Sequence, residues 1–218
     1  MTAKEFIDTL KDIVHQYSGV IPKREIFFLA KDFQFMPVAE VVKLLRDENY
    51  DHRLGAVSIL DWKARNEKTS VGERRDTYLA YIENHKYIDD WGLVDRAAPH
   101  VVGGYLFDKD RKPLYDLAKS PNPMERRTAI VSTYYFIRKN ELEDTFKIAE
   151  ILANDSDEFV QKAVGSWTRE AGKRDENKLK GFLDEYAPTL PRVTLRYAIE
   201  KFNPETRKHY LGMGKKNT

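Results

Sequence analysis

Cysteine is absent from the 218-residue chain, which excludes a disulfide framework, a thiolate metal site and a thiol nucleophile. Long apolar runs are missing too, and no stretch approaches the roughly 20 apolar residues that a membrane span requires. Net charge is small, since 37 basic and 35 acidic residues leave only +2. A surface that binds nucleic acid must therefore come from basic side chains gathered on one face.

The sequence also lacks a divider between domains. No segment is rich in Gly, Ser and Pro, so we predict one domain over residues 1–218. Charged residues recur at short intervals near the N-terminus, without the apolar run of a signal peptide. Together with the absence of cysteine, this pattern predicts a cytoplasmic protein that does not enter membranes.

Helical periodicity runs along the whole chain, whereas Asn-Gly and Asp-Gly turns and long alternating patterns are missing. Ser156 and Asp175 are predicted N-caps. The predicted helices cover residues 3–17, 23–33, 37–47, 50–66, 71–85, 89–106, 111–119, 123–139, 141–153, 156–172, 175–187, 190–202 and 204–211. The fold class is therefore all-α.

A short pattern recurs near the start of alternate helices: three residues, an alanine, and a small or branched apolar residue. Its alanines are Ala56, Ala97, Ala129, Ala163 and Ala198, spaced by 41, 32, 34 and 35 residues. Helix-pair repeats have periods of about 34–47 residues, and the small alanine lets neighbouring helices approach closely. We predict a helical repeat solenoid of about six stacked helix pairs with a concave groove.

The position two residues before each alanine is polar in four of the five repeats. It holds Leu54, Asp95, Arg127, Gln161 and Arg196. On one interpretation these residues are simply exposed to solvent. Recurrence at one structural position favours the other interpretation, a continuous polar track along one surface.

One cluster combines an aromatic ring with a carboxylate. Trp91 and Asp95 are four residues apart, so on a helix they share one face. An indole beside a carboxylate can bind a cationic substrate through cation–π attraction and charge pairing. The alternative interpretation places Trp91 in the core and pairs Asp95 with Arg96 or with a neighbouring helix.

Three groups of basic residues would form a stripe along a phosphate backbone if they stacked in register. Taken singly, each group is also typical of an ordinary helix surface. The predicted DNA-binding residues are Arg126, Lys162, Ser166, Arg169, Lys173, Arg174, Arg192 and Arg196.

Several segments together resemble the DNA alkylation repair family, the AlkD-like DNA glycosylases with HEAT-like repeats. The segments are Trp91-Gly92-Leu93-Val94-Asp95 followed by Pro99, and residues 19–22, 126–130, 162–165, 169–170 and 191–199. Each is weakly specific alone, but the combination covers nearly the whole chain. The resemblance implies a HEAT-like solenoid.

By position in these segments, the resemblance implies that Trp91, Asp95 and Arg127 form the active site. It implies hydrolysis of the N-glycosidic bond of cationic N3- or N7-alkylated purines in double-stranded DNA, without flipping the lesion into a deep pocket. It also implies that no metal or cofactor is needed, and we expect no obligate protein partner. Since no motif for a Schiff-base lysine occurs, we predict a monofunctional glycosylase of base excision repair.

Two positions depart from the family pattern. Ser166 stands where relatives often carry a second groove tryptophan, and Leu10 or its neighbours stand in place of an aromatic residue. Because successive helical residues are rotated by about 100°, we expect Ser166 to face the groove and Trp167 to be largely buried between repeats.

Two other functions are compatible with the sequence. One is a catalytically silent relative that binds damaged or branched DNA, which the departures at Ser166 and Leu10 support. The other is a helical scaffold that binds proteins, as many solenoids do. A glycosylase assay separates the first from the predicted enzyme, and salt-sensitive DNA binding argues against the second.

Overall fold

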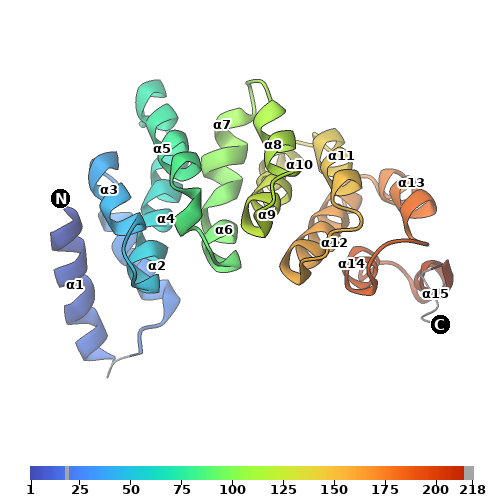
Figure 1. The fold of residues 1–218 in the computed structure, drawn as a ribbon, viewed down its shortest axis with the longest axis horizontal. Coiled ribbons are helices and arrows are strands. Elements are labelled where there is room, and N and C mark those ends of the chain that lie inside the picture. The colour runs from blue at the N-terminus through green and yellow to red at the C-terminus, as the bar shows by residue number, and fades with distance from the viewer. Residues whose placement is uncertain (18–19, 214–218) are drawn as a thin grey trace. The chain divides into compact units, whose positions relative to one another are not determined.

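The computed structural model describes residues 1–17 and 20–213, and within these ranges it contains helices and turns but no strand (Figure 1). Gly19, part of one family-like segment, lies outside the described residues. The all-α fold predicted from helical periodicity is confirmed. No helix in the described part of the chain is both long and apolar enough to cross a membrane.

The chain divides into two compact units, residues 1–105 and 106–218. The single domain over residues 1–218 stays a prediction. Unit 1 contains α1 (Ala3–Gln16), α2 (Lys23–Asp32), α3 (Val38–Leu45), α4 (Tyr50–Arg65), α5 (Val71–Glu83), the 3₁₀ turn η1 (His85–Tyr87), α6 (Trp91–Ala98) and the π-helical turn η2 (Pro99–Gly103). A short helix, α7 (Gly104–Leu106), lies at the boundary between the units.

Helix α4 forms the centre of unit 1. It packs against α2, α3, α5 and α6, and every residue from 54 to 61 is buried. A helix buried around its whole circumference acts as the core of its unit. Through α4, the starts of α2 and α6 are held in one packed structure.

Unit 2 contains α8 (Lys112–Leu117), α9 (Pro123–Ser132), α10 (Tyr134–Arg138), α11 (Glu143–Ile151), α12 (Glu158–Gly172), α13 (Glu176–Tyr186), α14 (Arg192–Ala198) and α15 (Pro204–Met213). Helix α12 packs against α9, α11, α13 and α14. Its contact with α14 requires Gly165, since a Cβ there would lie 2.5 Å from the carbonyl oxygen of Thr194.

The five repeated alanines are all buried, with at most 2% of their surface exposed. Each lies on a helix that packs against others in its unit. The alanines therefore lie inside the helix packing, and their role at close helix contacts stays a prediction.

Several predicted helices are shorter in the structure, most of all the one predicted over 190–202, which covers Arg192–Ala198, and two predicted helices are irregular within their length. The segment predicted over 89–106 begins at Trp91 and continues through the π turn at Pro99, whose ring nitrogen cannot donate a helical hydrogen bond. The segment predicted over 123–139 is interrupted at Thr133, whose hydroxyl donates to the Ile130 carbonyl at 2.7 Å. The turn over residues 85–87 was not predicted.

One predicted cap is correct and one is wrong. Asp175 caps α13 by accepting from the Lys178 amide at 3.1 Å. At α12 the cap is Asp157, which accepts from two backbone amides, rather than Ser156. The Asp157 side chain therefore sets the start of α12 at Glu158, one residue later than a cap at Ser156 would set it.

Candidate active site and nucleic-acid interface

The start of α6 presents the predicted tryptophan and carboxylate. Asp90 is the N-cap and accepts from the Gly92 amide at 2.8 Å. Trp91 is 43% exposed, and Asp95, one turn later on the same face, is half-buried. The alternative interpretation that placed Trp91 in the core is therefore wrong. An exposed indole beside a carboxylate is suited to a cationic aromatic ligand.

Two further side chains lie at the same place, and the sequence did not reveal them. The Tyr50 hydroxyl donates to Asp90 at 3.2 Å and accepts from the Lys23 ammonium at 3.3 Å. The Lys23 nitrogen also lies 5.9 Å from the centre of the Trp91 ring. Burial, and then the charge of Asp90, raise the pKa of Tyr50 above its ordinary value, whereas Lys23 opposes the rise.

Gly92 leaves room for this arrangement. A Cβ at Gly92 would lie 2.9 Å from Asp90 Oδ1 and 3.0 Å from the Tyr50 hydroxyl. Both distances are closer than ordinary packing allows. The glycine therefore lets Tyr50 and Asp90 meet directly over the first turn of α6.

A buried ionic network holds α6 on α4. The carboxylate of Asp61 is fully buried and pairs with Arg65 at 2.9 Å and with Arg96 at 2.5 Å. The Arg96 guanidinium also lies 4.6 Å from the Phe27 ring centre. Burial lowers the pKa of Arg96, and the Asp61 charge counteracts this effect. Arg96 thus pairs with Asp61, on the helix that packs beneath the candidate site.

In unit 2, Arg127 is only 7% exposed. Its guanidinium donates to the carbonyl of Phe159, on α12. Gln161, at the equivalent repeat position, donates to the Asp155 carbonyl at 2.7 Å. Because both side chains bind backbone carbonyls, they help to join neighbouring elements rather than only lining a polar surface.

The same repeat position varies in exposure. Leu54 and Arg127 are buried, Asp95 and Gln161 are half-buried, and Arg196 is exposed. The interpretation that this position is simply exposed to solvent is therefore wrong.

Arg126 is held within the protein. It forms two hydrogen bonds to Asp155, at 2.6 and 2.9 Å, and also donates to the carbonyls of Ser120 and Pro121. The bond to Asp155 raises the pKa of Arg126. Asp155 has a side chain that is only 4% exposed, so this pair fixes the start of α9 against the turn before α12.

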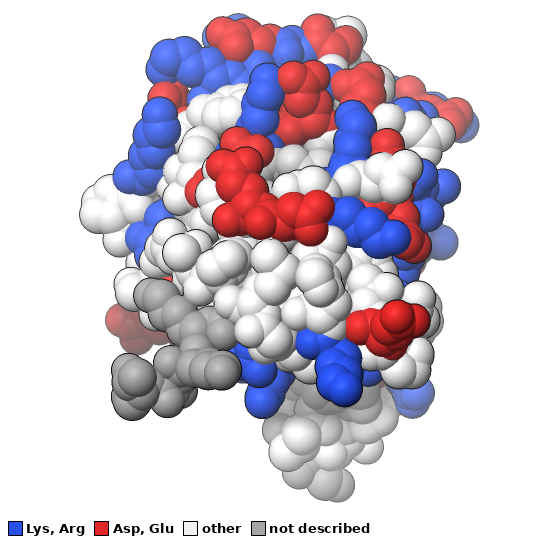
Figure 2. All heavy atoms as spheres, turned by 90° about the vertical axis from the view of Figure 1, so that its right-hand side faces the viewer, with Lys and Arg blue, Asp and Glu red and all other residues white. Residues whose placement is uncertain are grey.

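Most basic side chains on the predicted face of α12 form ion pairs with glutamates. Lys162 pairs with Glu158 at 2.6 Å, Lys173 with Glu170 at 2.7 Å, and Arg169 with Glu200. These pairs lower the positive charge that the face offers to a phosphate backbone. Acidic and basic side chains are likewise mixed on the end of unit 2 where α13 and α15 lie (Figure 2).

The remaining predicted basic residues differ in their surroundings. Arg192 donates to the Leu211 carbonyl at 2.8 Å. Arg174 and Arg196 are exposed, and neither forms an ion pair with a residue that the structure describes. A pocket of 370 Å³ is lined in part by Arg169, Lys173 and Arg174, so the structure brings these three together.

The two positions that depart from the family pattern are placed as follows. Leu10 is a core residue of α1. Ser166 and Trp167 are both half-buried, and the Trp167 ring packs 4.8 Å from that of Tyr134. The expectation of a largely buried Trp167 is correct only for its ring nitrogen, which is buried and has no hydrogen-bond partner among the described residues.

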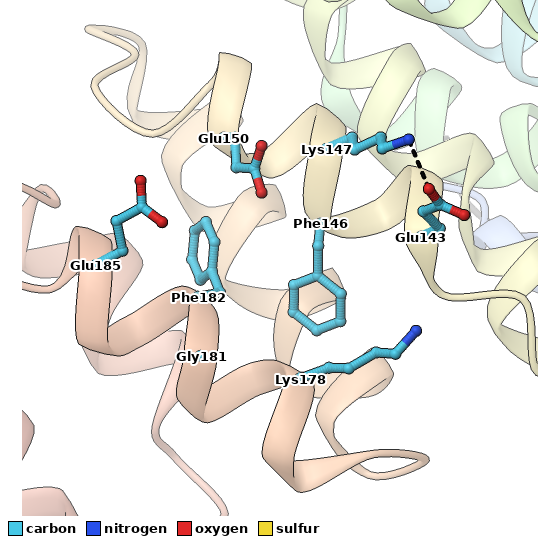
Figure 3. Close-up of a pocket in the computed structure, with 8 residues that line it drawn as sticks. All are labelled: Glu143, Phe146, Lys147, Glu150, Lys178, Gly181, Phe182 and Glu185. Carbon is cyan, nitrogen blue, oxygen red and sulfur yellow. Dashed lines mark ion pairs between the residues drawn. The ribbon is translucent and has the colours of Figure 1, made fainter.

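A second pocket in unit 2, of 260 Å³, holds none of the predicted residues. It lies between α11 and α13, where the rings of Phe146 and Phe182 are 6.0 Å apart (Figure 3). Lys147 at its rim pairs with Glu143 at 2.6 Å. In the described part of the chain, no group of three or more His, Asp or Glu residues is arranged to hold a metal ion.

The chain matches a model of a known protein family. A family model described as DNA alkylation repair enzyme matches residues 15–202, a range that includes both α6 and the basic residues of unit 2. No curated protein matches the chain.

Proposed function

The chain belongs to the DNA alkylation repair enzyme family, and from this premise we propose that it is a monofunctional DNA glycosylase. The proposed reaction hydrolyses the N-glycosidic bond of cationic N3- or N7-alkylated purines in double-stranded DNA, as part of base excision repair. The observation that carries the proposal is the exposed Trp91 ring one helical turn before the half-buried Asp95. We further propose that the protein acts in the cytoplasm, without a metal, a cofactor or an obligate protein partner.

The proposed chemistry uses the positive charge that the lesion already carries. The bond between C1′ and the purine nitrogen breaks, and its electron pair leaves with the base, which becomes neutral. The sugar passes through a state that resembles an oxocarbenium ion. Asp95 stabilises that charge and orients the water whose oxygen bonds to C1′, while the water proton passes to Asp95 or to solvent.

Trp91 supports the same charge distribution. The face of an indole attracts a cation, and the attraction grows when water is excluded. The exposed ring provides a surface for the alkylated base or the developing sugar cation. No acid is required to protonate the base, because the alkyl group already makes it a good leaving group.

Phosphate contacts are proposed for the basic residues of unit 2. Arg174 and Arg196 are the best suited of the predicted set, since they are exposed and form no ion pair among described residues. Arg127 is proposed to bind a phosphate of the same DNA while its guanidinium keeps the bond to Phe159. Lys162, Arg169 and Lys173 would first have to exchange a glutamate for a phosphate.

A base-release assay tests the proposal. Duplex DNA that carries 7-methylguanine is incubated with the protein, and free base is separated from the strand. Release of the base with a strand that breaks only after alkali treatment supports a monofunctional glycosylase. A strand cut directly by the protein, or DNA repaired without loss of the base, contradicts it.

A second function is favoured by one observation. Ser166 leaves α12 without an aromatic side chain at that position, and the neighbouring Trp167 packs on Tyr134. A relative that binds damaged DNA without releasing a base fits this arrangement. Salt-sensitive DNA binding with no base release would support it.

A further inference from the structure

The first residue of α2 brings a positive charge to the candidate site. Lys23, Tyr50 and Trp91 are the first residues of α2, α4 and α6. The Lys23 ammonium lies 3.3 Å from the Tyr50 hydroxyl and 5.9 Å from the Trp91 ring centre. The N-terminal ends of three helices therefore meet here, and each such end carries a partial positive charge.

Lys23 differs from the predicted basic residues of α12. Its side chain is exposed, and it forms no ion pair with any residue in the described ranges. The nearby Asp90 carboxylate instead accepts from the Tyr50 hydroxyl at 3.2 Å and from the Gly92 amide at 2.8 Å. The lysine charge thus remains available to an anion from outside the protein.

The aromatic rings hold the ammonium without neutralising it. Lys23 is 5.3 Å from the Tyr50 ring centre as well as near the Trp91 ring. Cation–π attraction at an exposed site is weak, so it orients the lysine but allows a stronger partner to displace the rings. A phosphate oxygen is such a partner.

We propose that Lys23 binds a phosphate of the DNA strand that carries the lesion. The proposal rests on the proposed function, because it assumes that a nucleotide lies against Trp91. The phosphate of such a nucleotide is joined to its base through one sugar, so it comes within reach of a cation beside the ring. Lys23 is a positioning residue, since it acts on the base only through the phosphate backbone of the strand.

The salt dependence of DNA binding tests this assignment. Each phosphate contact contributes about 0.9 to the slope of log K against log salt for duplex DNA. The K23M variant should lose about that amount of slope on both undamaged and 7-methylguanine DNA, and K23R should retain it. K31M is the matched control, because Lys31 is exposed on the same helix with its ammonium 5.3 Å from the Trp62 ring centre.

An unchanged slope in K23M, or an equal loss in K31M, overturns the proposal. Because Lys23 is exposed, the variants should fold, which circular dichroism checks; K23Q replaces K23M if the methionine variant aggregates.

Base release by the wild-type protein distinguishes failure of the phosphate contact from failure of the glycosylase proposal. If it shows the Lys23-dependent slope but releases no base, the glycosylase proposal fails and the phosphate contact stands. If it releases base and the K23M slope is unchanged, the phosphate contact fails and the glycosylase proposal stands.

Discussion

Arg96 on α6 donates to the buried carboxylate of Asp61 on α4, with 2.5 Å between the two atoms. Asp61 has no exposed surface, and His100 also lies 3.0 Å from it. The pair ties the helix that presents Trp91 and Asp95 to the centre of unit 1. The geometry of the candidate site therefore depends on an interaction beneath it.

Arg96→Met should lower the free energy of unfolding by about 3 kcal/mol, because the buried Asp61 carboxylate loses the more buried of its two arginine partners. Arg65→Met is the matched control. Arg65 binds the same carboxylate, but its side chain is 40% exposed, so its loss should cost less than about 1 kcal/mol. Urea denaturation measures both, and equal losses would show that Arg96 has no special role.

Substitutions of Arg127 and Arg196, which occupy the same repeat position, should affect stability and DNA binding differently. Arg127→Ala should reduce DNA affinity and also lower the free energy of unfolding by about 1–3 kcal/mol, since it removes a buried hydrogen bond from the Arg127 guanidinium to the Phe159 carbonyl. Arg196→Ala removes an exposed side chain and should change stability by less than about 0.5 kcal/mol. Binding and urea titrations of both variants give the comparison. An Arg127→Ala variant with full DNA affinity would place this residue away from the DNA.

The helices and the burial of the repeated alanines could be predicted because they depend on local patterns. The buried alanines at Ala97 and Ala129 follow from periodicity that one sequence displays directly. The spacing of Trp91 to Asp95 left the exposure of the ring open, and the family-like segment around the two residues favoured a site there. These features need no knowledge of which helices pack together.

The contacts around the site could not be predicted, because they depend on tertiary packing. Lys23 is 27 residues from Tyr50, and Tyr50 is 40 residues from Asp90. Arg126 was assigned to DNA from its position on a helix, but Asp155, 29 residues away, binds it. Pairing across such distances is decided by which helices meet, and a single sequence does not contain that information.

Ser166→Trp should raise base release or DNA affinity, since the change supplies the aromatic side chain that relatives often carry. The protein should stay folded, because Ser166 is only half-buried. Gly165→Ala is the contrasting variant. Its added Cβ would lie 2.5 Å from a carbonyl oxygen of α14, so it should destabilise the fold. Thermal melts and base-release rates test both, and an unfolded Ser166→Trp protein would show that this position faces the interior.

The proposed glycosylase activity is tested most directly at Asp95. Single-turnover release of 7-methylguanine is measured for the wild type and for Asp95→Asn, with Asp89→Asn as the control. Asp89 is an exposed carboxylate just before α6 that pairs with Arg53 at 3.1 Å. We expect near-complete loss of release in Asp95→Asn with DNA binding equal or tighter, and little change in Asp89→Asn. Release at the wild-type rate by Asp95→Asn would contradict this expectation.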